Sequence, residues 1–165
     1  MSPLINRATI RRTGRTPRCA PRTRGGMAAV EGMVVLSTLL MILFVIFDFG
    51  LATFQYNTLS AVARRVARAA SLRGAAAPPD QVAWGPAEYV GTAADNSEIA
   101  AIAAPLLATM PGSDVSIDVT WPNGTNQEND TVHVRVSYTH HACVPLLPGV
   151  TVLNLQAEST MPIVH

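Results

Sequence analysis

The residue whose chemistry stands out in this chain is Glu31, a carboxylate within the apolar run Met27–Phe47. An ionised carboxylate costs free energy in hydrocarbon, and the cost rises towards roughly 3 kcal/mol at the centre of a bilayer. The charge becomes tolerable where it meets a cation, such as the amino terminus of a neighbouring subunit. We therefore expect Glu31 to act in subunit assembly. The alternative is that it caps the first helical turn, where an acid also suits the helix dipole.

Two glycines, Gly25 and Gly26, stand directly before the apolar run. Glycine beside an apolar helix favours extended and accessible backbone, which a peptidase requires. A cut after Gly26 would make Met27 the new amino terminus and would place Glu31 one helical turn away. We expect Gly26 and Met27 to flank a cleavage site.

The best candidates for metal ligands are His133, His140, His141 and His165, with Cys143 nearby. Their spacing lacks the paired ligands of a structural zinc site, and adjacent histidines on a strand point to opposite faces. We expect histidines on the surface or in loops, with no metal and no other cofactor. The sequence also lacks a Ser/His/Asp order, a phosphate-binding glycine loop or an acid pair in a supporting context. These absences predict that the chain is not an enzyme.

The apolar run Met27–Phe47 has the length of a membrane span, because a bilayer core about 30 Å thick needs about 20 apolar residues of helix. Residues 1–26 carry seven arginines and no acid, whereas residues 74–165 carry nine acids and one arginine. Positive flanks stay in the cytoplasm, so the amino terminus is expected inside and the acidic part outside. Next to a membrane span, these arginines are better interpreted as a signal that sets the orientation of the span than as an arm that binds nucleic acid. Cys19 and Cys143 then lie on opposite sides, so no internal disulfide is expected.

Three segments follow from these patterns: a basic cytoplasmic leader (1–26), a long helix (27–73) and a head outside the membrane (74–165). Asp48 is expected to mark the membrane end of the long helix. Beyond it, apolar residues at spacings of three and four fall on one face, and arginines fall on the other. The apolar residues are Leu59, Val62, Val66 and Ala69, and the arginines are Arg64, Arg65 and Arg68. The arginine face is expected to be solvated, with binding to acidic partners or lipid headgroups as the alternative.

The head is predicted to contain short helices followed by strands. One helix is expected over 86–94, and another from Glu98 to about Thr109, capped by Asn96-Ser97 and kinked or divided by Pro105. From Asp114 the apolar period changes to two, which predicts three strands within 115–121, 132–138 and 151–161. An antiparallel sheet with one apolar face needs a cover, and the outer half of the long helix can supply it. The expected fold is α+β and pilin-like, a long N-terminal helix packed on a small antiparallel sheet.

The residues around Gly26 resemble those of a known family. A basic leader ending in Gly26, then small or apolar residues, Glu31 and a long apolar helix, resembles the type IV prepilin processing motif. The pattern Ala28-Ala29-Val30-Glu31, with an apolar run into Asp48-Phe49-Gly50, is similar to TadE-like pseudopilins of the tight-adherence (Flp) pilus system. The family usually has Glu where this chain has Asp48, and Phe or Tyr where it has Gly32. The similarity covers roughly residues 24–70.

This resemblance implies a structural minor pseudopilin that takes part in assembling a Tad/Flp-type pilus or a related secretion machinery. It implies cutting by a prepilin peptidase after Gly26. The implied partners are that peptidase, other pilin and pseudopilin subunits, the pilus assembly platform and membrane lipid, with no nucleic acid. The implied location is the bacterial inner membrane, as a single-pass protein, or the pilus itself.

Two alternatives remain open on the residues alone. One is an uncleaved, signal-anchored module whose acidic head binds something outside the membrane. The other is a secreted protein cut near Gly50-Leu51-Ala52, although the apolar run is too long for a signal peptide.

Overall fold

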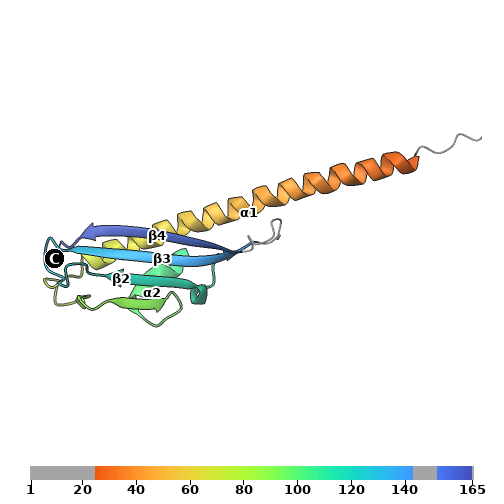
Figure 1. Cartoon of the computed structure of the whole chain (residues 1–165). Helices are drawn as coiled ribbons and strands as arrows, with labels where there is room; N and C mark the ends of the chain where they lie inside the picture. The colour runs from red at the N-terminus through yellow and green to blue at the C-terminus, as the bar shows by residue number, and fades with distance from the viewer. Residues whose placement is uncertain (1–24, 143–151, 165) are drawn as a thin grey trace, which may run out of the picture. The chain divides into compact units, whose positions relative to one another are not determined.

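A computed structural model describes residues 25–142 and 152–164 of the chain (Figure 1). The chain divides into two compact units, one ending at Ser37 and one beginning at Thr38. The helix α1 (Gly25–Ser71) runs through the boundary between them. The second unit also holds a short helix, α2 (Glu98–Ala103), two single 3₁₀ turns, η1 (Ala104–Leu106) and η2 (Gly112–Asp114), and four strands, β1 (Tyr89–Thr92), β2 (Val115–Thr120), β3 (Thr131–His141) and β4 (Val152–Pro162).

The four strands form one antiparallel sheet in the order β1-β2-β3-β4, so each strand pairs with its neighbour in the chain. The β3–β4 pair is the longest, and its register runs from Thr131 opposite Pro162 to His141 opposite Val152. The later half of α1 and α2 both lie behind the sheet in Figure 1, and no described helix covers the opposite face, which is called the open face below. The predicted α+β arrangement of a long N-terminal helix and an antiparallel sheet is confirmed.

The core of the second unit lies between α1 and the sheet. Leu59, Val62 and Val66 are fully buried, as their helical spacing predicted. They belong to one cluster with the inward-facing strand residues Val115, Ile117, Val119, Val132, Val134 and Val136, and with Ile99 and Ala103 of α2. Full burial of a Val, Leu or Ile side chain contributes about 1.5–3 kcal/mol. The sheet therefore depends on α1 for its cover.

The main difference from the expected elements is β1. A short helix was predicted over 86–94, but residues 89–92 form an edge strand paired with β2. Tyr89, Val90 and Thr92 have aromatic or β-branched side chains, which favour strands, and pairing with β2 satisfies the backbone. The expected helix was therefore wrong, and the sheet has four strands rather than three.

The capping of α2 follows the sequence closely. Ser97 is the N-cap residue, and its hydroxyl accepts a hydrogen bond from the N–H of Ala100 at 3.1 Å. The α-helical part ends at Ala103, and Pro105 lies in the following 3₁₀ turn. Proline lacks an N–H and cannot continue the α-helical ladder, so it divides the segment as expected.

Candidate assembly site

The proposed cleavage residues lie at the start of α1. Gly25 and Gly26 are the first two residues of the helix, so the expectation of extended backbone there was wrong. The first four N–H groups of a helix have no partner within the helix, so two glycines can begin one without losing backbone hydrogen bonds. Gly26 is exposed, and a Cβ added there would meet nothing within 4 Å. Packing within the chain therefore gives no reason for a glycine at this position.

Glu31 lies on the exposed surface of α1. The first turn of the helix contains no acidic residue, because α1 already begins at Gly25. A capping carboxylate acts on the free N–H groups of the first turn, and Glu31 lies beyond that turn. Within the part of the chain that the structure describes, its carboxylate makes no hydrogen bond or ion pair. The geometry therefore disfavours the capping alternative in the full-length chain.

The surface around Glu31 is apolar on every side. All residues from Gly26 to Phe47 are exposed, and they include large side chains such as Met33, Leu36, Leu43 and Phe47. In the described ranges, α1 is the one helix long and apolar enough to cross a membrane. An exposed surface that is apolar all round needs lipid or other protein chains to cover it.

Asp48 is the first residue of α1 after Gly26 that is not exposed. Its Oδ1 atom lies 3.4 Å from Nε2 of His140 in β3, and the two side chains are 15% and 5% exposed. The expectation that His140 lies on the surface or in a loop was wrong. The inward alternation of Val132, Val134, Val136 and Tyr138, continued by one step, would have placed His140 inside. Asp48 thus joins α1 to the sheet where the fully exposed part of the helix ends.

The other candidate ligands do not gather around this pair. His141 is exposed on the opposite face from His140, and His133 is half-buried on the open face of the sheet. Cys143 and His165 lie outside the described residues. No three His, Cys, Asp or Glu side chains within residues 25–142 and 152–164 form a group that could hold a metal ion.

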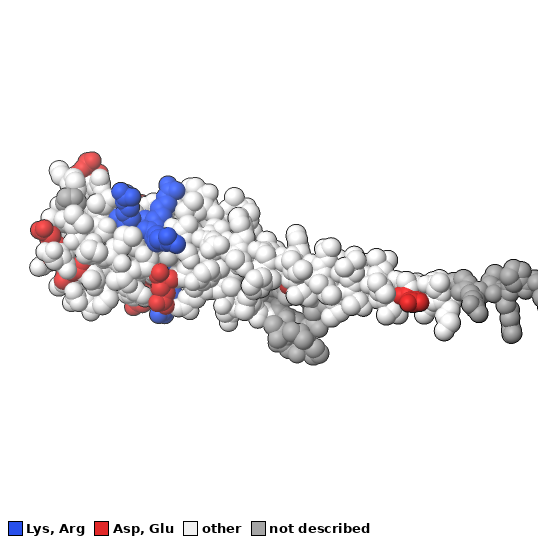
Figure 2. Space-filling model, turned by 90° about the horizontal axis from the view of Figure 1, so that it is seen from above, with Lys and Arg blue, Asp and Glu red and all other residues white. Residues whose placement is uncertain are grey.

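Three exposed arginines, Arg64, Arg65 and Arg68, lie on the face of α1 turned away from the sheet. Arg64 donates from Nε to the carbonyl of Ser60 at 3.2 Å, and none of the three forms an ion pair with another described residue. Basic side chains gather in one patch on the face in view in Figure 2. Arg73 differs, because its guanidinium stacks 4.5 Å from the ring centre of Trp84 and pairs with Glu98.

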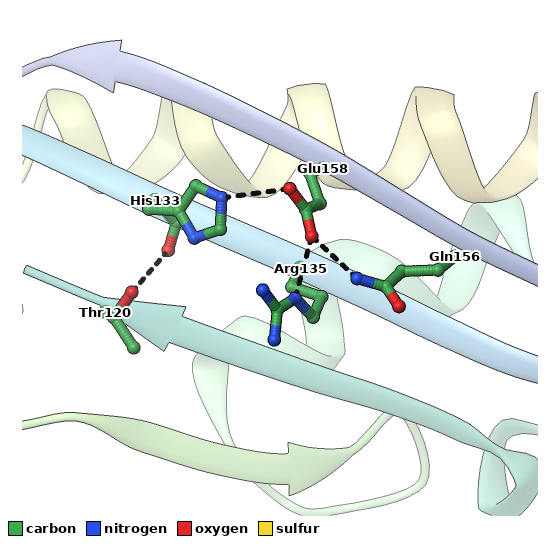
Figure 3. A network of polar contacts seen from close by, with 5 residues as sticks. All are labelled: Thr120, His133, Arg135, Gln156 and Glu158. Atoms are coloured by element: carbon green, nitrogen blue, oxygen red, sulfur yellow. Dashed lines mark hydrogen bonds and ion pairs between the residues drawn. The ribbon is translucent and has the colours of Figure 1, made fainter.

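The open face of the sheet carries a polar network centred on Glu158 (Figure 3). Its Oε1 accepts hydrogen bonds from Nε of Arg135 at 2.9 Å and from Nε2 of Gln156 at 2.6 Å. Oε2 of Glu158 lies 3.4 Å from Nε2 of His133. The hydrogen bond from Arg135, followed by that from Gln156, lowers the pKa of Glu158 below its usual value. This face is polar but internally paired.

These parts define a class of protein, a head of helices and sheet whose first helix also carries an exposed apolar segment of membrane-spanning length. Within that class, residues 26–68 match the family of TadE-like proteins. The matched segment includes Gly26, Met27, Glu31 and Asp48, and the resemblance expected from the sequence is confirmed over this range. No curated protein matches the chain, and no solved structure does.

Proposed function

We propose that the chain is a structural, non-enzymatic minor pseudopilin that takes part in assembling a Tad/Flp-type pilus or a related secretion machinery. The observation that carries the proposal is Glu31, whose carboxylate has no partner among the residues that the structure describes, on a helix surface that is apolar all round. The TadE-like match over 26–68 supports the same role. The partners would be other pilin and pseudopilin subunits and the assembly platform.

Maturation would supply the missing partner of Glu31. A prepilin peptidase would cut between Gly26 and Met27 and create an ammonium group one turn from Glu31. Pairing within one chain would be strained along the helix axis, whereas a neighbouring subunit shifted along that axis could bring its own ammonium group beside the carboxylate. In a medium of low dielectric the attraction is strong, and each charge relieves the cost of burying the other.

The same arrangement suits the inner membrane of a bacterium. The seven leader arginines favour a cytoplasmic amino terminus, and the acidic head would lie outside the membrane. The apolar surface from Gly26 to Phe47 would be covered by lipid before assembly and by neighbouring helices afterwards. An uncleaved, signal-anchored binding module is the alternative, and in that protein Glu31 would need no partner from another subunit.

The test replaces the charge of Glu31 and keeps its size. Glu31→Gln should leave membrane insertion intact, because a span without a charge inserts more readily. It should abolish crosslinking to the other pilus subunits and surface piliation. Glu31→Asp is the matched control, because it keeps a carboxylate and should retain part of the assembly. If Glu31→Gln crosslinks and piliates like the unaltered chain, the assembly role is wrong.

A further inference from the structure

The two edge strands of the sheet, β1 and β4, differ in whether their outward backbone groups have hydrogen-bond partners. At one edge, β1 is four residues long, and the N–H of Thr92 donates to the carboxylate of Asp95 at 2.7 Å. The N–H of Asp95 returns a hydrogen bond to the carbonyl of Thr92 at 3.2 Å. A side-chain turn thus occupies the backbone groups at the end of this edge. At the other edge, β4 is 11 residues long and, among the described strands, pairs with β3 alone.

The backbone directions along β4 follow from the two residues after it. The N–H of Ile163 donates to the carbonyl of Asp130 on the β3 side at 2.7 Å, and the N–H of Val164 donates to the carbonyl of Ser71 in α1 at 2.9 Å. Successive residues of an antiparallel strand turn their N–H and C=O groups to opposite sides. Every second residue before Val164 therefore turns its N–H and C=O groups away from β3. These residues are Val152, Asn154, Gln156, Glu158 and Thr160. Pro162 has the same orientation, so its missing N–H removes no hydrogen bond between β4 and β3.

These outward backbone groups have no hydrogen-bond partner among the described residues. A long edge of this kind is a template for pairing with another chain, and proteins usually protect it with lysine, proline or inward-pointing charge. On β4 the one charged residue is Glu158, whose carboxylate is already held by Arg135 and Gln156 on the open face (Figure 3). Pro162 protects one end alone. At the other end, Val152 and Leu153 are 49% and 47% exposed.

We propose that the outer edge of β4 receives an extended segment of a different pilus subunit by strand addition. Main-chain hydrogen bonds to the outward groups would give affinity, and alternate side chains of the added strand would give specificity. On the open face the added strand would place polar residues beside Gln156, Glu158 and Thr160. On the α1 face it would place an apolar residue beside Leu153. Basic residues in the added segment would suit a head that carries nine acids against one arginine after residue 73.

A second copy of this chain fits the edge less well. Its β1 is short, and its end is occupied by Asp95. Antiparallel pairing of two β4 edges about a two-fold axis would run the two α1 helices in opposite directions, whereas both should enter the same membrane. The occupant is therefore a different subunit, and this part of the inference rests on the proposed function.

The experiment places a photocrosslinking residue at Gln156 in the full chain, produced in its membrane with its native partners. The matched position is Val90 on the short strand β1, which is 69% exposed at the opposite edge of the sheet. A crosslink from 156 to another pilus subunit, with none from 90, is expected. Crosslinks to a second copy, equal crosslinks from both positions, or none from 156 would overturn the inference.

Two further measurements distinguish a loss of binding at β4 from misfolding of a variant. Leu153→Lys should remove the 156 crosslink with the melting temperature unchanged, and Val90→Lys should leave the crosslink intact. Amide hydrogen exchange on the unaltered chain should slow at Gln156, Glu158 and Thr160 when the partner subunits are co-produced. Unchanged exchange at these amides would contradict strand addition. If Glu31→Gln abolishes assembly but position 156 gives no crosslink, strand addition at β4 is wrong and the proposed function stands. If Glu31→Gln assembles like the unaltered chain, the proposed function itself is wrong.

Discussion

The two halves of α1 have the same helical backbone and opposite surroundings. From Gly26 to Phe47 every residue is exposed and the apolar side chains lie on all sides. From Gln55 to Ala70 a buried stripe alternates with an exposed face that carries arginines. A helix with a stripe packs on one surface, whereas a helix that is apolar all round needs cover on every side. The second half is therefore covered by its own chain, whereas no residue that the structure describes covers the first half.

The two acidic residues of α1, Glu31 and Asp48, also differ in their surroundings. Asp48 lies at the change between the halves and has His140 within 3.4 Å. Glu31 lies in the uncovered half and makes no ion pair with any residue that the structure describes. A buried acid needs a partner, so Glu31 would need one if lipid or other chains came to cover this half of the helix. Our proposal therefore assigns the assembly role to the first half of α1.

The largest expected effect comes from removing the covered half. A soluble chain that begins at Thr53 keeps Leu59, Val62 and Val66 and should fold cooperatively. A chain that begins at Gly74 loses the helical cover of the sheet and should aggregate or remain unfolded, because the apolar face of the sheet would be exposed. Thermal unfolding followed by circular dichroism compares the two. Equal cooperative melts would mean that the sheet does not depend on α1.

A smaller effect should separate single residues on either side of the same helix. In the chain from Thr53, Leu59→Ala should lower the free energy of unfolding by about 2–5 kcal/mol, because Leu59 is fully buried. Phe54→Ala is the control, since Phe54 is 53% exposed and its loss should change that energy by less than about 0.5 kcal/mol. Urea unfolding measures both. A larger loss for Phe54→Ala would place the packed face of the helix elsewhere.

Periodicity predicted most of the fold. The stripe of Leu59, Val62 and Val66, the two longest strands and the Ser97 cap each depend on residues close together in the chain, where local spacing carries the information. The short strand β1 was not predicted, because four residues carry little periodic signal and its pairing with β2 is a contact between distant segments. His140 was missed for a related reason. The predicted strand ended at Tyr138, two residues before His140, and the partner Asp48 lies 92 residues earlier in the chain.

The candidate site divides in the same way. Gly26, Met27 and Glu31 were predicted from their order beside an apolar run, and the TadE-like match covers all three. Their cutting and assembly roles stay predictions, since both involve a second molecule. The open edge of β4 could not be predicted from the sequence. It depends on which strand ends the sheet and on which backbone groups turn outward, and tertiary pairing decides both.

The amino-terminal residue of the protein extracted from its membrane tests the account most directly. Edman sequencing or intact mass should give Met27 for the unaltered chain. Gly26→Leu should leave the heavier precursor, whereas Gly50→Leu should mature normally, although an added Cβ meets nothing within 4 Å at either position. An intact leader on the unaltered chain would favour the uncleaved anchor, and an amino terminus near Thr53 would favour a secreted protein. Either result would contradict the proposal that cutting after Gly26 creates the partner of Glu31.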